Sequence, residues 1–358
     1  MAYLPLSTAN LPDPAIDPAQ GSSPEDYFGV GLWVGNNSAS NISVTGIGFQ
    51  PDFFWGKLRS FGTGHRLVDS IRGVTKMLYS NVNNAEATES DAFASFDSDG
   101  FTIGQDTTGG GLNYSTNTGV GWVWKANGSA TLNEEGSIDS QVSANTESGF
   151  SIVSYDGGSS AGTIGHGLSN APDFIVIKNR DAGFSWTCYH ESLGAGYYIQ
   201  LNSTDAQTAT TDWNNTQPTT NVFSVNGAEG RINRIDESFI AYCFHSVEGF
   251  SKFSSYVGNG DPDGTFVYTG FRPAFVILKR TDSGGSWTMS DSVRDTINPI
   301  TPYLFPHDSA AEATDTSNEL DFVSNGFKLR HSSRNNTSGA TYIYMAFSAN
   351  PFKFSTAF

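Results

Sequence analysis

The sequence repeats one short pattern three times. Each copy has a proline, then a phenylalanine two positions later and a lysine six positions later. The copies begin at Pro51, Pro172 and Pro273, and successive copies are separated by 121 and 101 residues. Repetition at this length indicates one folding unit used several times. It favours a presenting or connecting surface over a single catalytic pocket.

Further landmarks recur around these prolines in the same order. A Gly-Phe or Gly-Leu pair precedes each one, at Gly48, Gly167 and Gly270, and the motif Ala-Glu-Ala-Thr occurs at 85–88 and 311–314. Each copy also opens and closes on an apolar run. We therefore predict three tandem homologous units behind an N-terminal arm. The predicted boundaries are the arm 1–26, unit 1 at 27–126, a polar linker at 127–148, unit 2 at 149–247 and unit 3 at 248–358.

Composition predicts an all-β protein. The 358 residues include 26 Phe and 39 Gly, and short apolar runs alternate with Gly, Asn, Asp and Ser, which is typical of strands and turns. About seven or eight short strands in each unit favour a β-sandwich or jelly roll. The continuous apolar run 174–177 predicts a strand buried on both faces. We expect Lys178, which ends that run, to extend its amine to solvent.

The charge balance argues against nucleic acid as a partner. The formal net charge is −17, and the 19 basic residues form no stripe. No apolar stretch approaches 18 residues, so we expect no membrane insertion, and the first residues lack the basic and apolar regions of a secretory signal.

Cysteine and histidine give no sign of a metal or cofactor. Cys188 and Cys243 both fall in predicted strands of unit 2. Free buried thiols are the main interpretation, and a disulfide between neighbouring strands is the alternative. The six histidines show no short spacing typical of zinc ligands. We therefore predict neither a metal nor a cofactor.

One position of the repeat carries residue types that are used in hydrolytic chemistry. Asp69-Ser70, His190-Glu191-Ser192 and Asp291-Ser292 fall at equivalent places, so histidine replaces aspartate in unit 2. The residue type is not kept across the copies, and the sequence has no G-x-S-x-G elbow. We predict no catalytic residues and a non-enzymatic protein.

Trp213 is the candidate for contact with a sugar or a partner. Most of the seven tryptophans fall in predicted strands, whereas Trp213 lies in a polar loop with no counterpart in the other units. The alternative is a loop anchor that packs on its own sandwich.

The N-terminal arm differs from the rest of the chain. Five prolines within residues 1–26 block helix and central strand, which predicts an extended segment. We expect it to dock onto another protein, and a disordered tail is the alternative. The candidate docking residues are the spaced apolar side chains Leu4, Leu6, Leu11 and Ile16.

Several long motifs resemble the virion structural proteins of marine bacteriophages. The resemblance includes the opening at 11–28, the segment 48–53, Gly165-His166-Gly167-Leu168, Gly249-Phe250-Ser251-Lys252 and the closing run 342–347. Such modules are similar to those of tail-fibre-like and other particle-surface proteins. The resemblance implies a virion component and carries no catalytic residues.

We accordingly expect a non-enzymatic structural protein on the virion surface. The favoured role is a tail-associated fibre or adhesin subunit that contacts the host, located on the tail rather than the capsid. The alternatives are a capsid decoration or head-fibre protein and, from another class, a glycan depolymerase. Expected partners are other virion proteins through the arm, a host-surface glycan and further copies of the chain. The sequence leaves open whether the three units form a ring or a linear string.

Overall fold

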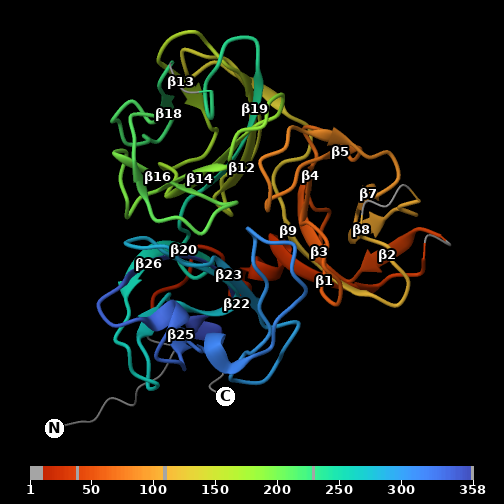
Figure 1. Cartoon of the computed structure of the whole chain (residues 1–358), viewed down its shortest axis with the longest axis vertical. Helices are drawn as coiled ribbons and strands as arrows, with labels where there is room; N and C mark the ends of the chain where they lie inside the picture. Colours follow the sequence, from red (N-terminus) through yellow and green to blue (C-terminus); the bar gives the residue numbers. More distant parts are fainter. Residues whose placement is uncertain (1–10, 38–39, 108–110, 228–229, 356–358) are drawn as a thin grey trace.

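Three lobes surround a common centre (Figure 1). The computed structural model describes residues 11–37, 40–107, 111–227 and 230–355. Within these ranges the regular structure consists of β-strands and short 3-10 turns. The prediction of an all-β fold is confirmed.

Unit 1 forms a four-stranded sheet, a three-stranded sheet and a short two-stranded ribbon. The four-stranded sheet has the order β1-β9-β3-β4, the smaller sheet the order β2-β8-β7, and the ribbon pairs β5 with β6. The strands are β1 (Phe28–Val34), β2 (Ile42–Thr45), β3 (Phe53–Leu58), β4 (Arg66–Asp69), β5 (Lys76–Met77), β6 (Ala87–Thr88), β7 (Phe93–Asp97), β8 (Gly100–Ile103) and β9 (Thr118–Trp124).

Unit 2 has the largest sheet. Its order is β10-β11-β12-β19-β14-β15-β16-β17, and β13 pairs separately with β18. The strands are β10 (Thr131–Asn133), β11 (Ser140–Asn145), β12 (Phe150–Asp156), β13 (Gly162–Gly165), β14 (Phe174–Asn179), β15 (Thr187–His190), β16 (Tyr197–Gln200), β17 (Thr208–Ala209), β18 (Val222–Val225) and β19 (Ser238–Phe244).

Unit 3 again has a four-stranded and a three-stranded sheet. Their orders are β20-β26-β22-β23 and β21-β25-β24. The strands are β20 (Ser251–Val257), β21 (Phe266–Tyr268), β22 (Phe271–Arg280), β23 (Thr288–Asp291), β24 (Leu320–Val323), β25 (Gly326–Leu329) and β26 (Thr341–Pro351). Three turns accompany them, η4 (Thr316–Asn318), η5 (Arg334–Asn336) and η6 (Phe352–Phe354).

The repeated proline motif occupies the same place in each unit. Its strand, β3, β14 or β22, lies between the last strand of the unit and the following short strand. The register also agrees, because the motif phenylalanine faces the same position of the last strand each time. These pairs are Phe53 with Trp124, Phe174 with Phe244, and Phe275 with Phe347. Common ancestry of the units stays a prediction, which this shared order supports.

Each motif strand is buried on both faces. Successive side chains of a strand point to opposite sides. Phe53 therefore lies in a central core shared by all three units, whereas Phe54 lies in the separate core of unit 1. In unit 2, Val176 likewise lies in the central core and Ile177 in the separate core of that unit. Both faces are covered, which explains the continuous apolar run and confirms the interpretation of residues 174–177.

The central core holds the three units together. It collects inward-facing side chains of β3, β14 and β22 and of the last strand in each unit. At its centre an apolar cavity of about 20 Å³ is lined by residues of every unit, among them Phe53, Phe174 and Ile277. Its walls expose no polar atoms that could bind a water molecule, so we expect the cavity to stay dry. The units therefore pack as a ring around one core, which settles the choice between a ring and a linear string.

The predicted linker is part of the fold, so that prediction is wrong. Within 127–148, β10 and β11 pair with each other and β11 pairs with β12, which extends the sheet of unit 2. Val142 and Ser140 face inward, and the Ser140 hydroxyl donates to the Gly165 carbonyl at 2.8 Å. An edge strand is held by backbone hydrogen bonds and one covered face, so its other side chains can be polar. That polarity gave the segment the composition of a linker.

Candidate functional site

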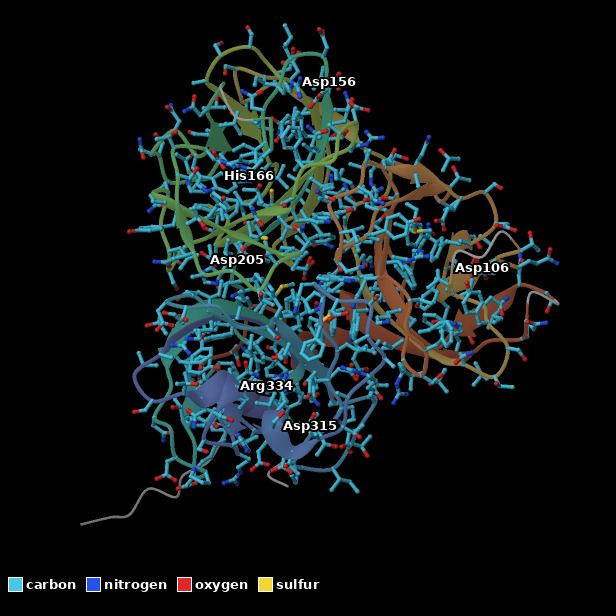
Figure 2. The ribbon with its side chains drawn as sticks, in the orientation of Figure 1. Asp106, Asp156, His166, Asp205, Asp315 and Arg334 are labelled. Carbon is cyan, nitrogen blue, oxygen red and sulfur yellow. The ribbon has the colours of Figure 1, made fainter. Side chains whose placement is uncertain are left out.

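The polar residues of the repeat meet where the units join, not in an open pocket. We name the interfaces the 1–2, 1–3 and 2–3 junctions after the units they connect. The titratable side chains labelled in Figure 2 are spread over separate lobes, with Asp106 in unit 1, His166 in unit 2 and Asp315 in unit 3. The junctions are therefore the candidate sites to be examined for chemistry.

The 1–2 junction contains a buried charge network centred on Arg72. Its Nε donates to Asp69 at 2.5 Å, and its terminal nitrogens donate to Glu86 at 3.1 Å and to the Tyr242 hydroxyl of unit 2 at 3.1 Å. Arg180 of unit 2 makes a two-point contact with Glu86 at 3.0 Å. Burial alone would raise the pKa of Glu86, but Arg180 and Arg72 outweigh it and lower that pKa.

The 1–3 junction repeats this network with residues of unit 3. Arg294 donates to Asp291 at 2.5 Å and to Glu312 at 2.7 Å. Arg59 of unit 1 donates to Glu312, also at 2.7 Å, and takes the role of Arg180. Trp122 of unit 1 takes the role of Tyr242, and its indole donates to Asp291 at 3.0 Å.

The 2–3 junction lacks the arginine–carboxylate network but keeps the backbone contact. His190 and Leu193 stand where the other units have Asp and Arg, and Thr281 stands where units 1 and 2 have Arg. Met345 occupies the register position of Tyr242 and Trp122. The Gln207 amide still donates to the Thr281 carbonyl, at 2.9 Å. The equivalent bonds, Glu86 to Arg180 and Glu312 to Arg59, are both 2.7 Å.

A second set of contacts closes the ring. The residue fourteen positions after each motif proline is His65, Trp186 or Trp287. Each donates a ring N–H to a backbone carbonyl of a neighbouring unit, at 2.9, 2.8 and 2.9 Å respectively. His65 donates through Nε2 because its Nδ1 accepts from Trp55. Burial lowers the pKa of His65 well below its usual value, which keeps it neutral. The acceptors are the carbonyls of Phe305, Tyr79 and Gln200.

The motif lysines are buried, contrary to the expectation for Lys178. Lys57, Lys178 and Lys279 are all 0% exposed. Their amines donate to backbone carbonyls, as in the 2.6 Å bonds from Lys57 to Thr63 and from Lys178 to Asn179. Burial lowers the pKa of each lysine to about 8. Carbonyls that turn inward after the strand supply the partners that solvent would otherwise provide.

These clusters have a structural use in the described chain. Asp69 and Asp291 are both 0% exposed, and each accepts from an arginine of its own unit and from a donor of another unit. A substrate could reach them only if two units separated. His190 is also buried, and its Nδ1 accepts from the Ser192 amide at 3.1 Å. The position considered for hydrolysis therefore joins units.

Trp213 does not face solvent, so its prediction as an exposed contact residue is wrong. It is 1% exposed and belongs to the core of unit 2. Its indole donates to the Tyr197 carbonyl at 3.0 Å, and its ring packs edge-on against Tyr189 at 5.6 Å. The alternative, a loop anchor on its own sandwich, is confirmed. A polar loop sequence did not reveal that its one large side chain turns inward.

The described part of the arm packs on its own chain. Ile16 is 0% exposed in the central core, and the Ala15 amide donates to Glu248 at the start of unit 3. Two turns follow, η2 (Pro18–Gln20) and η3 (Pro24–Asp26). The prediction of Ile16 as a docking residue for another protein is therefore wrong, because the central core already covers it. Leu11 lines a surface cleft, and Leu4 and Leu6 lie outside the described residues.

The thiols and histidines form no metal site in the ranges that the structure describes. No group of three His, Cys, Asp or Glu side chains is placed to hold an ion there. Cys188 and Cys243 are free and buried, Cys188 in the central core and Cys243 in the core of unit 2. The interpretation as free thiols is confirmed. In the same ranges no helix is long and apolar enough to cross a bilayer.

Sequence reasoning missed two exposed aromatic residues in unit 3. Phe266 and Tyr268 lie on β21 and are 46% and 54% exposed. A comparison of the repeats could have found them, because β2 and β13 carry small residues at the matching positions.

The chain belongs to a family described as a domain of unknown function, DUF7483, which matches residues 23–351. No curated protein and no solved structure matches the chain. The family match runs from the arm through the last strand of unit 3. The three units are thus matched together as one domain.

Proposed function

We propose that this protein is a non-enzymatic structural component of a virus particle surface, and that it presents its lobes to the outside. The observation that carries the proposal is the closed ring. The charged and aromatic residues of the repeat join the units at the junctions. A body built in this way is a rigid support for exposed loops.

A tail-associated fibre or adhesin subunit that contacts the host is the favoured role. The three units succeed one another cyclically, with unit 1 reaching unit 3, unit 2 reaching unit 1 and unit 3 reaching unit 2 through equivalent contacts. A body with such internal threefold character fits a position of threefold symmetry. Trimeric tail fibres offer that position, and so do threefold sites of a capsid. A capsid decoration or head-fibre protein is therefore the second candidate.

Immunogold labelling of purified particles tests this role. Antibodies against the full chain should label intact particles at the tail. Label confined to the head would replace the tail role by the capsid role. Absence of the chain from purified particles, checked by peptide mass spectrometry, would overturn the proposal.

The non-enzymatic part is tested separately. The purified chain is incubated with host polysaccharide, and new reducing ends are measured over time. We expect no release above a heat-denatured control. Saturable release of reducing ends would establish a depolymerase instead.

A further inference from the structure

Unit 3 carries an aromatic strip on the outer face of its small sheet. Phe266 and Tyr268 alternate along β21 with the buried Val267, so both rings stand on the same, outward side. The ring of Phe266 lies over Gly326 of the neighbouring strand, and the ring of Tyr268 lies close to Gly270. A Cβ at Gly326 would lie only 3.1 Å from the Phe266 ring, so this glycine leaves room for that ring, whereas Gly270 meets the Tyr268 ring at ordinary contact distance.

The strip is particular to unit 3. The cross-strand pairs Val44–Phe101, Ile164–Phe223 and Val267–Phe327 fix the alignment of the three small sheets. At the positions of Phe266 and Tyr268, unit 1 has serine and threonine and unit 2 has threonine and glycine. These residues are Ser43, Thr45, Thr163 and Gly165. Exposed aromatic side chains do not stabilise the sandwich by burial, so their presence on one copy points to a contact outside the chain.

A cleft of about 410 Å³ adjoins the strip, and Tyr268 forms part of its wall. The described N-terminal segment contributes Pro12 and Pro14, and the C-terminal turn contributes Lys353. The cleft volume falls within the roughly 300–1,000 Å³ typical of small-molecule sites. The cleft and the strip therefore form one continuous surface.

Polar groups of both charges border the exposed ring. The Lys252 amine lies 5.8 Å from the centre of the Tyr268 ring. Lys252 and Glu248 both line the cleft, and Glu248 is exposed. On the other side of the strip, Lys328 stands opposite Phe266 on β25 and pairs with Asp263. Ammonium donors and carboxylate acceptors thus flank two apolar ring faces.

We propose that this cleft and the Phe266–Tyr268 strip bind a glycan chain of pyranose sugars. A pyranose has an apolar C–H face, which stacks on an aromatic ring, and a rim of hydroxyls, which bond to ammonium and carboxylate groups. The strip supplies the aromatic rings, and its borders supply the ammonium and carboxylate groups. The mixed charge fits a neutral or weakly acidic sugar better than a polyanion. This inference rests on the proposed host-contact function and assigns it to one site.

A glycan microarray of neutral and uronic-acid oligosaccharides, probed with the full chain, identifies the sugar. Calorimetric titration of the strongest hit then compares wild type with three variants. Tyr268→Ala should weaken binding about tenfold, as the loss of one stacked aromatic does. Phe266→Ser, which installs the residue of unit 1, should weaken it about threefold. Phe61→Ala is the matched control, because Phe61 is 47% exposed in unit 1, and it should leave affinity unchanged.

Three results would overturn the inference. One is an array without any saturable hit. Another is a hit whose affinity is the same in wild type, Tyr268→Ala and Phe266→Ser, with thermal midpoints showing all three folded. The third is loss of self-association in Tyr268→Ala, measured by sedimentation, which would assign the strip to a second copy of the chain. Particle labelling decides the host-contact role independently, so either proposal can fail alone.

Discussion

The 1–2 and 2–3 junctions both hold two units together, but they do so with different side chains. Both use equivalent positions of the repeat, and both keep the backbone hydrogen bond, which reaches the carbonyl of Arg180 in the 1–2 junction and that of Thr281 in the 2–3 junction. The 1–2 junction buries a network of two arginines and two carboxylates. At the equivalent positions the 2–3 junction has the uncharged residues Leu193, Gln207 and Met345 together with His190.

This comparison shows that the arginines and carboxylates of a junction are present or absent as a set. A buried ion pair compensates the desolvation of its members only when the network is complete, and removing one partner leaves an isolated buried charge. A mixed junction would therefore be less stable than either form. The 1–3 junction keeps the full charged set, with Arg294 between Asp291 and Glu312. Two junctions thus carry the complete charged network, the third carries none of it, and no junction carries only part of it.

The largest expected effect comes from breaking the charged network at its centre. Arg72→Leu installs the residue of unit 2 and leaves Asp69 buried without its arginine. We expect the free energy of unfolding to fall by about 3–5 kcal/mol. Urea denaturation followed by tryptophan fluorescence measures this change.

The matched control converts the whole 1–2 junction to the neutral form. Asp69→His, Arg72→Leu, Glu86→Gln, Arg180→Thr and Tyr242→Met are introduced together. This variant should regain most of the stability that Arg72→Leu loses, because no charge is left buried alone. If the fivefold variant is less stable than Arg72→Leu, the two junctions are not interchangeable solutions.

Acid should weaken the neutral junction through His190. Burial lowers its folded-state pKa to about 4, from an ordinary value near 6.5. The folded state then binds fewer protons than the unfolded state, so the stabilisation is complete above pH 6.5 and is lost as the pH falls toward 4. The loss amounts to at most about 3 kcal/mol.

His190→Gln isolates this contribution. His65, His166 and His307 also have pKa values lowered by burial, so the wild-type slope contains several groups. Urea unfolding of wild type and variant at several pH values between 4 and 7 gives the difference. A smaller slope in the variant is expected, and equal slopes would contradict the assignment.

Removing a ring-closing indole should have a similar effect in both kinds of junction. Trp186→Phe and Trp287→Phe leave the carbonyls of Tyr79 and Gln200 without their donors. Each change should cost about 1–3 kcal/mol, the usual penalty for a buried unsatisfied polar group. Unfolding free energies of the two variants provide the comparison. A cost more than twice as large in one of them would show that the ring contacts are not equivalent.

The smallest effect is expected at the partly exposed rim. Arg180 is 21% exposed, and its partner Glu86 keeps Arg72 after Arg180→Ala. We expect a loss of about 1 kcal/mol, in the range of solvent-accessible ion pairs, which shrinks further in 1 M salt. Thermal unfolding scans at low and high salt measure this loss. Thr281→Ala, at the same position of the 2–3 junction, should show no salt dependence.

Much of the fold could be predicted because its signals are local. The all-β class follows from short apolar runs between turn residues, and the double burial of residues 174–177 follows from an uninterrupted apolar run. The strands within the polar segment 127–148 are not predictable in this way, because backbone pairing to a neighbouring strand leaves little trace in side-chain composition. The burial of Trp213 is not predictable either, because the polarity of its loop does not show which way the indole points.

The sequence by itself determined the repeat, the strand pattern and the places where one unit departs from the others. His190 in place of aspartate was already visible there. Only the tertiary structure decided what those departures mean. Asp69 meets Tyr242 across 173 residues of chain, and no local pattern can show which unit lies against which face. Contacts between units depend on how the three sheets close around one core, and that closure brings together residues with no relation in sequence spacing.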